Sequence, residues 1–195
     1  MHGLINRAIQ CFVRDTYSNE VWLDVTRFAG LDFTGFEAML TYEAEVTDLV
    51  IAAIGSILSK SREEVLEDVG TYLVSHPNVE ALRRLLRFGG VDFVDFLHSL
   101  DELPDRARLA VDDLDLPGMA LREHSHERFS LTCIDGPPGF GHAMMGILRA
   151  MADDYGALVY LEHSGGGAGR EVIEITLIES EFAEGREFDL GARAG

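Results

Sequence analysis

The chain is poor in cysteine, in basic residues and in long apolar runs, and each shortage excludes a class of protein. Its two cysteines, Cys11 and Cys133, can form at most one disulfide, so neither a disulfide framework nor a zinc cluster is predicted and both thiols are expected to be buried. Lysine and arginine total 16 against 34 acidic residues, a formal net charge of -18. Such a field repels phosphate and anionic lipid, which argues against nucleic acid and membrane partners and leaves basic or neutral proteins.

Apolar runs are too short for a membrane protein. The most apolar stretch, residues 49–58, falls well below the roughly 20 residues that span a bilayer. The first seven residues resemble the start of a helix and lack the basic segment, apolar run and cleavage site of a signal peptide. We therefore expect a cytoplasmic, stand-alone domain. The 195 residues, 47% of them hydrophobic, are enough for one core or two small lobes.

Residues 3 to 111 have the apolar spacing of helices, as in Leu4, Ile5, Ala8, Ile9 and Phe12. Residues 61–64, Ser-Arg-Glu-Glu, form a capping box that predicts a helix start. Gly70 lies inside that helix, where it permits a close backbone approach. The pair at 89–90, Gly-Gly, is expected to end another helix and turn the chain into the one that bears His98.

The pattern changes after Pro117 to short alternating runs. Strands are predicted at 119–122, 129–133, 158–163 and 171–179, with a helix at 140–155 and a hairpin loop at 164–169. The fold class is α+β: a helical lobe over residues 1–115, then a small antiparallel sheet with one helix over 116–184. A frayed tail follows at 185–195, and a ligand pocket is expected between the lobes.

Two groups of spaced residues carry a family resemblance. The first is Gly3, Ile5, Asn6, Val21, Trp22, Thr41, Tyr42, Glu64, Leu66 and Gly70. The second is Leu86, Gly89, Gly90, Phe93, Phe96, Leu97, Leu100, Asp101, Leu103 and Pro117. In order and spacing they resemble haem nitric oxide/oxygen binding (H-NOX) domains over most of the chain. The resemblance implies a distal helical lobe, a proximal lobe with the sheet, and a cleft that in the family holds haem.

The resemblance places Pro104 where family members carry the histidine that ligates the haem iron. An amide nitrogen closed in a proline ring is not a metal donor, so Pro104 cannot hold iron. It suits the first turn of a new helical segment through residues 106–111 instead. Ile5 and Ile9 match positions on the distal side of the pocket, and Pro117 matches the proline that presses on the porphyrin. The residue pattern alone predicts these three as ordinary core.

A second departure falls where family members carry tyrosine, serine and arginine at alternate positions to hold the haem propionates. Here those positions are Cys133, Asp135 and Pro137. Arginine grips a carboxylate through a bidentate, charge-assisted fork, which neither Cys133 nor Pro137 can supply. The Asp135 carboxylate would repel a propionate. The candidate replacements for the clamp arginine are Arg122, Arg128 and Arg149.

Two histidines remain as non-standard iron ligands. His142 matches the position where oxygen-binding members place a distal tyrosine, although a histidine in the first turn of a helix is also an ordinary feature. On a continuous helix His98 would point about 240 degrees away from position 104, so we expect it to face solvent or cap the helix. His124 and His126 lie beside two glutamates, where a polar hairpin turn is a simpler prediction than a metal site.

The sequence therefore predicts an H-NOX-like sensor or regulatory domain that has no conventional haem, binds no confidently assigned metal and is not an enzyme. It would hold another apolar ligand in the cleft, or none, and signal to a partner protein. By resemblance, that partner is a histidine kinase or a cyclic-dinucleotide enzyme. The alternative is a haem-based NO or O2 sensor that uses His142 or His98. The remaining expectations are that 153–154, Asp-Asp, form a solvated acidic face, and that four residues line the pocket or fill the core: Met144, Met145, Leu148 and Met151.

Overall fold

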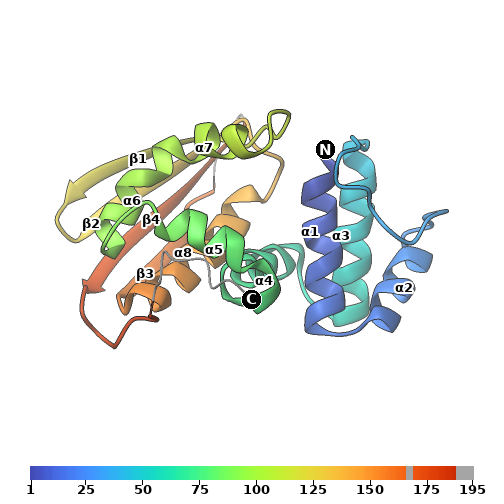
Figure 1. The fold of residues 1–195 in the computed structure, drawn as a ribbon, viewed down its shortest axis with the longest axis horizontal. Coiled ribbons are helices and arrows are strands. Elements are labelled where there is room, and N and C mark those ends of the chain that lie inside the picture. Colours follow the sequence, from blue (N-terminus) through green and yellow to red (C-terminus); the bar gives the residue numbers. More distant parts are fainter. Residues whose placement is uncertain (166–168, 188–195) are drawn as a thin grey trace, which may run out of the picture.

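The structure is a computed structural model that describes residues 1–165 and 169–187. Its elements follow one another along the chain (Figure 1). The α-helices are α1 Gly3–Thr16, α2 Asn19–Phe28, α3 Ala44–Leu58, α4 Arg62–Ser75, α5 Glu80–Arg87, α6 Phe93–His98, α7 Leu103–Ala110 and α8 Phe140–Tyr155. Short 3-10 helices lie at η1 Pro77–Val79 and η2 Ser99–Glu102. The strands are β1 Gly118–Ser125, β2 Arg128–Ile134, β3 Leu158–His163 and β4 Arg170–Glu179. The α+β class is confirmed.

Local capping explains where two of the helices begin. The Ser61 hydroxyl accepts from the Glu64 amide, and the Glu64 carboxylate accepts from the Ser61 amide at 2.7 Å, so the predicted capping box of α4 is confirmed. At α1, Nδ1 of His2 accepts from the Leu4 amide at 3.1 Å. These side chains satisfy backbone donors that the first helical turn leaves without partners.

The four strands form an antiparallel sheet in the order β1-β2-β4-β3. Phe129 pairs with Ile175 and Leu131 with Ile173, so the alternating apolar side chains of β2 and β4 meet on one face. Side chains of α6, η2 and α8 pack on that face to complete a single core. The opposite side of the sheet, here named the outer face, carries the intervening residues of each strand.

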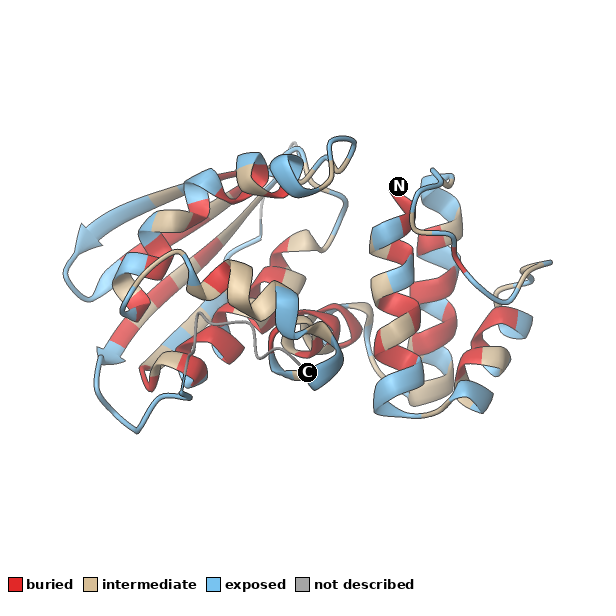
Figure 2. Cartoon of the chain, viewed as in Figure 1, coloured by how far each residue is buried: buried red, intermediate tan, exposed pale blue. Residues whose placement is uncertain are grey.

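Two separate groups of buried residues divide the molecule (Figure 2). One lies among α1, α2, α3 and the part of α4 that carries Val69 and Tyr72. The other joins the sheet and α8 to Val74, Leu86 and Leu100. The cores therefore divide within α4, not at residue 115 as the sequence pattern predicted. Helices α5 to α7 belong with the sheet because their buried apolar side chains are part of the same core, a contact that helical spacing cannot reveal.

The lobes are joined where α4 crosses α8. A Cβ on Gly70 would lie 2.0 Å from the carbonyl oxygen of Ala143, and one on Gly146 would lie 2.0 Å from that of Glu67. Both contacts are far shorter than any van der Waals distance, so glycine is required at each position for the two backbones to touch. The predicted close approach at Gly70 is confirmed.

The end of α8 corrects two expectations. Asp154 is 1% exposed and pairs with Arg83 at 2.7 Å and Arg87 at 3.6 Å, so it is a buried ion pair and not a solvated acidic face. Its backbone carbonyl accepts from the Arg186 amide at 2.9 Å. This hydrogen bond ties residue 186 to the end of α8, where a frayed tail was expected from residue 185 onward, and residues 188–195 lie outside the described residues.

The apolar face predicted for the helix at 140–155 is confirmed in α8. All four side chains that were predicted to line the pocket or fill the core are buried in the sheet core: Met144, Met145, Leu148 and Met151. In the described residues, no helix combines the length and apolarity needed to cross a membrane.

Candidate functional site

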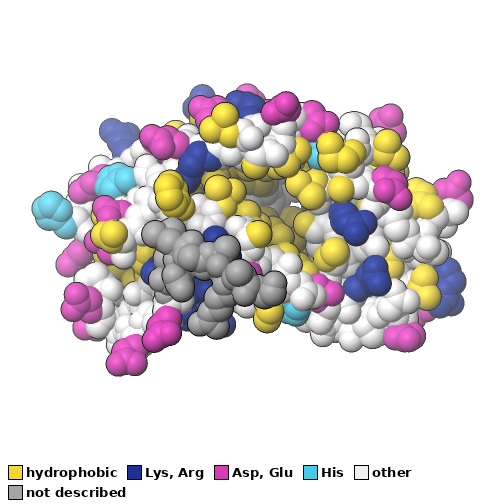
Figure 3. All heavy atoms as spheres, in the orientation of Figure 1, with side chains coloured by type: hydrophobic (Ala, Val, Ile, Leu, Met, Phe, Trp, Pro, Cys, Tyr) yellow, Lys and Arg dark blue, Asp and Glu magenta, His cyan; other side chains and the backbone are white. Residues whose placement is uncertain are grey.

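A hollow bordered by hydrophobic side chains separates the two lobes (Figure 3). On the helical side, Ile9 is buried in the lobe core and Ile5 is partly buried against it. Polar contacts that cross between the lobes include the following pair. Nε2 of His2 lies 3.1 Å from Oδ1 of Asp113, and Arg62 donates to the carbonyl oxygen of Pro138 at 3.3 Å.

Pro104 is buried in the first turn of α7. The chain reaches it through the 3-10 helix η2, so 98 to 110 is not one continuous α-helix. A missing amide proton costs nothing in a first turn, because that amide has no helical partner. The predicted start of a new helical segment at Pro104 is confirmed.

His98 ends α6 with half of its side chain exposed, and its Nε2 lies 3.4 Å from Oε2 of Glu123 on β1. Its ring meets the edge of Phe129 with centroids 6.1 Å apart. The imidazole therefore lies at the edge of the sheet, as expected of a solvent-facing residue. His124 lies near the end of β1, 2.8 Å from the Ser130 hydroxyl, and His126 lies in the turn of the β1–β2 hairpin.

The end of β2 and the turn after it bring Cys133, Asp135 and Pro137 together beside Pro117. A Cβ on Gly136 would lie 2.9 Å from Cγ of Pro117, which places that buried proline against the turn. Asp135 is exposed in the left-handed region at φ 56°, and its amide donates to the Gly169 carbonyl at 2.8 Å. Pro117 comes from a separate segment, so only folding brings it to this turn.

Cys133 is 2% exposed at this site. Burial, with a smaller contribution from the negative charge of Glu171, raises the pKa of its thiol to about 12. The thiol is therefore neutral and unreactive at physiological pH. Cys11 is only partly buried, so the expectation of two buried thiols is confirmed for Cys133 alone.

A pocket of about 190 Å3 opens at the same turn. Its lining is Cys133, Gly136, Pro138, Phe140, Gly169, Arg170 and Glu171. None of the arginines considered from the sequence lines this pocket. Arg128 begins β2 at the end of the strand away from the turn, Arg122 lies on β1, and Arg149 is bound to Glu67.

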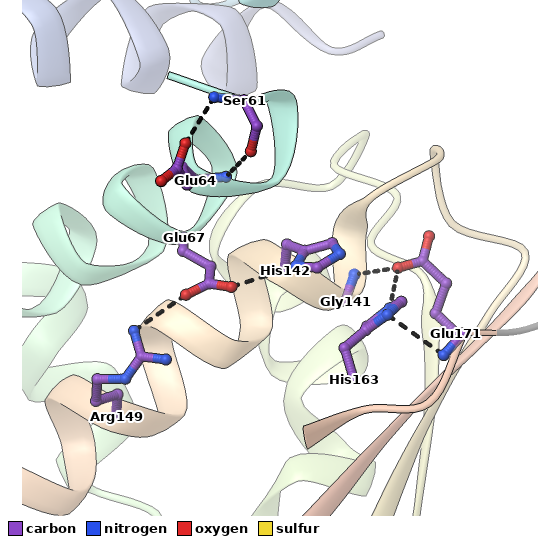
Figure 4. A network of polar contacts seen from close by, with 9 residues as sticks. Ser61, Glu64, Glu67, Gly141, His142, Arg149, His163 and Glu171 are labelled. Atoms are coloured by element: carbon purple, nitrogen blue, oxygen red, sulfur yellow. Dashed lines mark hydrogen bonds and ion pairs between the residues drawn. The ribbon is translucent and has the colours of Figure 1, made fainter. Parts of the chain in front are cut away.

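Glu171 is the central polar residue of the site, and the sequence analysis did not single it out. Its carboxylate accepts from the amides of Gly139 at 2.7 Å and Gly141 at 2.8 Å, at the start of α8. Nε2 of His163 lies 3.1 Å from the same group (Figure 4). Because Nδ1 of His163 accepts from the Gly165 amide, its Nε2 carries the proton and donates to Glu171.

This environment keeps Glu171 charged. Partial burial acts to raise its pKa, but the two backbone donors and His163 outweigh burial and lower the pKa below the usual 4.5. A carboxylate supplied by β4 therefore occupies the positive end of α8. A sequence signal existed: Glu171 shares the inward face of β4 with Ile173, Ile175 and Leu177, where a charged residue breaks the apolar alternation.

His142 occupies the first turn of α8, as predicted. Its Nδ1 lies 3.3 Å from Oε1 of Glu67 on α4, and its ring stacks on His163 with centroids 4.2 Å apart and planes at 27°. Arg149 donates to the other oxygen of Glu67 at 3.1 Å. Figure 4 shows the resulting chain of contacts from α4 through α8 to β3 and β4. Within residues 1–165 and 169–187, no three His, Cys, Asp or Glu side chains are arranged to hold a metal ion.

This two-lobed arrangement is that of a known class of sensor domains. Residues 2–163 match the family model for haem-NO-binding domains, and the chain belongs to that family. Its fold is that of solved H-NOX proteins. One from S. oneidensis, in the Fe(II) state, is 17% identical with a TM-score of 0.74, over 93% of this chain and 98% of that one. The I5F mutant of T. tengcongensis H-NOX is 15% identical with the same TM-score, over 92% and 99%.

The chain is also similar to part of larger proteins. Soluble guanylate cyclase gcy-31 of Caenorhabditis elegans is 22% identical over 154 residues, which is 79% of this chain and 22% of the cyclase. Soluble guanylate cyclase 89Db of Drosophila melanogaster is 20% identical over 155 residues, 80% and 23% respectively. The chain thus spans less than a quarter of the length of these relatives. It is an H-NOX sensor domain of the kind found in soluble guanylate cyclases.

Proposed function

We propose that this H-NOX domain does not hold haem in the manner of its family and senses an uncharged apolar ligand in the inter-lobe hollow instead. The observation that carries the proposal is the position of Glu171. Its carboxylate accepts hydrogen bonds from the amides of Gly139 and Gly141. These amides directly follow the turn that corresponds to the propionate clamp. The anion position at this end of the cleft is filled by the protein itself.

Electrostatics supports this reading. A propionate brought to the turn would approach the Asp135 and Glu171 carboxylates. Two like charges about 4 Å apart repel by roughly 4 kcal/mol at the effective dielectric of a protein surface. Arg170 lines the adjoining pocket. Its single positive charge offsets only part of the repulsion from the two carboxylates. A neutral ligand meets no such cost.

Three residues bear on whether the chain can ligate a haem iron. Pro104 supplies no donor at the position matched to the axial histidine. His142, the first substitute, is bound to Glu67 and stacked on His163. His98, the second, pairs with Glu123 at the sheet edge. Either substitute would have to break these contacts before it could reach a cofactor in the cleft.

We further propose that ligand binding changes the angle between the lobes and that a partner protein reads the change. The contacts of His2 with Asp113 and of Arg62 with Pro138 cross between the lobes, so a change of angle must alter both. By family resemblance, the partner is a histidine kinase or a cyclic-dinucleotide enzyme.

A matched pair of lipids tests the ligand class. 1-Hexadecanol and palmitate have the same chain length and differ in the charge of the head group, and each is used to displace the neutral dye Nile red from the protein. We expect hexadecanol to bind about tenfold more tightly than palmitate, which is about 1.4 kcal/mol, and Glu171→Gln to reduce the difference. Equal affinities, tighter binding of palmitate, or no binding of either lipid would contradict the proposal.

The competing function is a haem sensor that uses His142, the only substitute in the first turn of α8. The two functions are distinguished by expressing the wild type and a His142→Ala variant in haem-supplemented cells. A Soret band at one haem per chain that disappears in the variant would establish the competing function and overturn ours.

A further inference from the structure

The outer face of the sheet has no helix packed on it in the described residues, because the helices that join the sheet core all cover its other side. The pairing registers define rows across this face. One row runs Arg122, Ser130, Glu174, Glu162 from β1 to β3, and the next runs Arg128, Thr176, Tyr160. Tyr160 and, beyond it on β4, Ile178 are each 58% exposed. A surface this regular, with exposed apolar side chains, suits another protein surface.

Charge divides the outer face into two halves. The β1–β2 half carries Arg122 and Arg128, and the β4–β3 half carries Glu174 and Glu162. Arg170, at the end of β4, is the exception. Within the described part of the chain, none of the four charged residues of the two rows forms an ion pair. Arg122 and Glu162 are separated by three strand spacings, about 14 Å, which is too far for contact within one sheet.

We infer that the outer face is a dimerisation surface whose partner is a second copy of this chain. A two-fold axis lying in the interface, parallel to the strands and between β2 and β4, brings the β1–β2 half of one sheet over the β4–β3 half of the other. It keeps each row opposite itself, so Arg122 faces Glu162 of the second copy and Ser130 faces Glu174. Such an interface is isologous: every pairing occurs twice. The surface is self-complementary in charge.

Size and net charge make the dimer weak. Four strands about 4.8 Å apart, with about seven residues each at 3.3 Å per residue, give a face of roughly 400 Å2. This is half of the area of about 800 Å2 that each partner buries in a standard interface. Two chains of charge -18 also repel, although ions screen charges beyond about 8 Å at physiological salt. An interface of this size belongs to the weak, transient class, and we expect a dissociation constant of roughly 10 to 100 µM.

Charge reversal tests the inference without dependence on the ligand. Sedimentation velocity is run between about 5 and 500 µM, a range that brackets the expected dissociation constant. Three variants are compared: Arg122→Glu with Arg128→Glu, Glu162→Arg with Glu174→Arg, and the control Arg14→Glu with Arg27→Glu on the helical lobe. Circular dichroism checks that each is folded. We expect the wild type and the control to dimerise, each outer-face variant to be monomeric, and an equimolar mixture of the two to dimerise again.

The sedimentation results can support or overturn dimerisation through the outer face. Restored dimerisation in the mixture would show that the outer faces themselves meet, because an outer face with four acidic side chains then pairs with one that has four basic side chains while both chains keep a negative net charge. A wild type that stays monomeric over the whole range would overturn the inference, and so would outer-face variants that dimerise as well as the wild type, or a mixture that stays monomeric.

Discussion

Nε2 of His163 donates to the Glu171 carboxylate at 3.1 Å, and the same carboxylate caps the start of α8. Two strands and a helix are thus tied together by one anion that belongs to the chain. Haem propionates are anions of the same kind. In the proposed function, this internal carboxylate takes the place of an external one.

Replacing Glu171 by glutamine should reveal its charge through pH. Because the pKa of Glu171 is lowered in the folded state, its contribution to stability is complete above the ordinary value of 4.5 and is lost as the pH falls below it. We expect Glu171→Gln to be less stable than the wild type by about 1 to 2 kcal/mol at pH 7. Urea unfolding from pH 7 to pH 3 should show the difference shrinking toward low pH. A difference that does not change with pH would contradict an ionised Glu171.

The crossing of α4 and α8 predicts a steric effect. Alanine is a better helix former than glycine by about 1 kcal/mol, yet Gly146→Ala would place its Cβ 2.0 Å from the Glu67 carbonyl. We expect overpacking to outweigh the helix preference and to destabilise the protein by about 2 kcal/mol or more. The control Gly118→Ala meets Ile134 at an ordinary 3.6 Å and should be near neutral. Thermal unfolding measures both, and a stabilised Gly146→Ala would disprove the close crossing.

The buried ion pair at the end of α8 predicts a larger loss. Asp154→Asn removes the negative charge that faces Arg83 and Arg87. Removing one partner of a buried pair typically costs about 3 to 5 kcal/mol, because the remaining charge stays desolvated. Asp153→Asn alters an exposed neighbour and should change stability by less than about 0.5 kcal/mol. Equal effects of the two substitutions in urea unfolding would show that Asp154 is not buried among these arginines.

Thiol labelling tests the burial of the clamp position. With a pKa raised to about 12, Cys133 has almost no thiolate at pH 8, and its side chain is inaccessible. We expect iodoacetamide to leave Cys133 unmodified in the native protein and to label it fully in urea, as mass spectrometry of the peptides would show. Rapid native labelling of Cys133 would mean that the end of β2 is open to solvent.

Local signals in the sequence predicted most of the secondary structure. The helix at 140–155 and the strand at 158–163 have the bounds that were expected, because a left-handed glycine flanks each end of α8 and β3 is a short, mostly apolar run. The capping box at Ser61 is likewise a contact of four consecutive residues. Features of this kind are decided within a short segment, so a single sequence contains them.

Long-range contacts account for what the sequence did not predict. Asp154 looks like a surface residue until α5 places Arg83 and Arg87 against it. The division of the cores within α4 depends on which surface α5 to α7 pack against. Among the candidate residues, Cys133, Asp135 and Pro137 share one turn, but Glu171 joins them only through the register of β2 with β4. The roles assigned to Ile5, Ile9 and Pro117 in a pocket stay predictions.

A titration of the purified protein with haemin tests the central claim most directly. The Soret absorbance is followed beside a variant that restores the family residues, Pro104→His, Cys133→Tyr, Asp135→Ser and Pro137→Arg, and that removes the competing charge with Glu171→Gln. We predict that the wild type shows no saturable one-to-one binding up to about 50 µM haemin, whereas restoring the ligand and the clamp confers it. One-to-one binding by the wild type at submicromolar haemin would contradict the account.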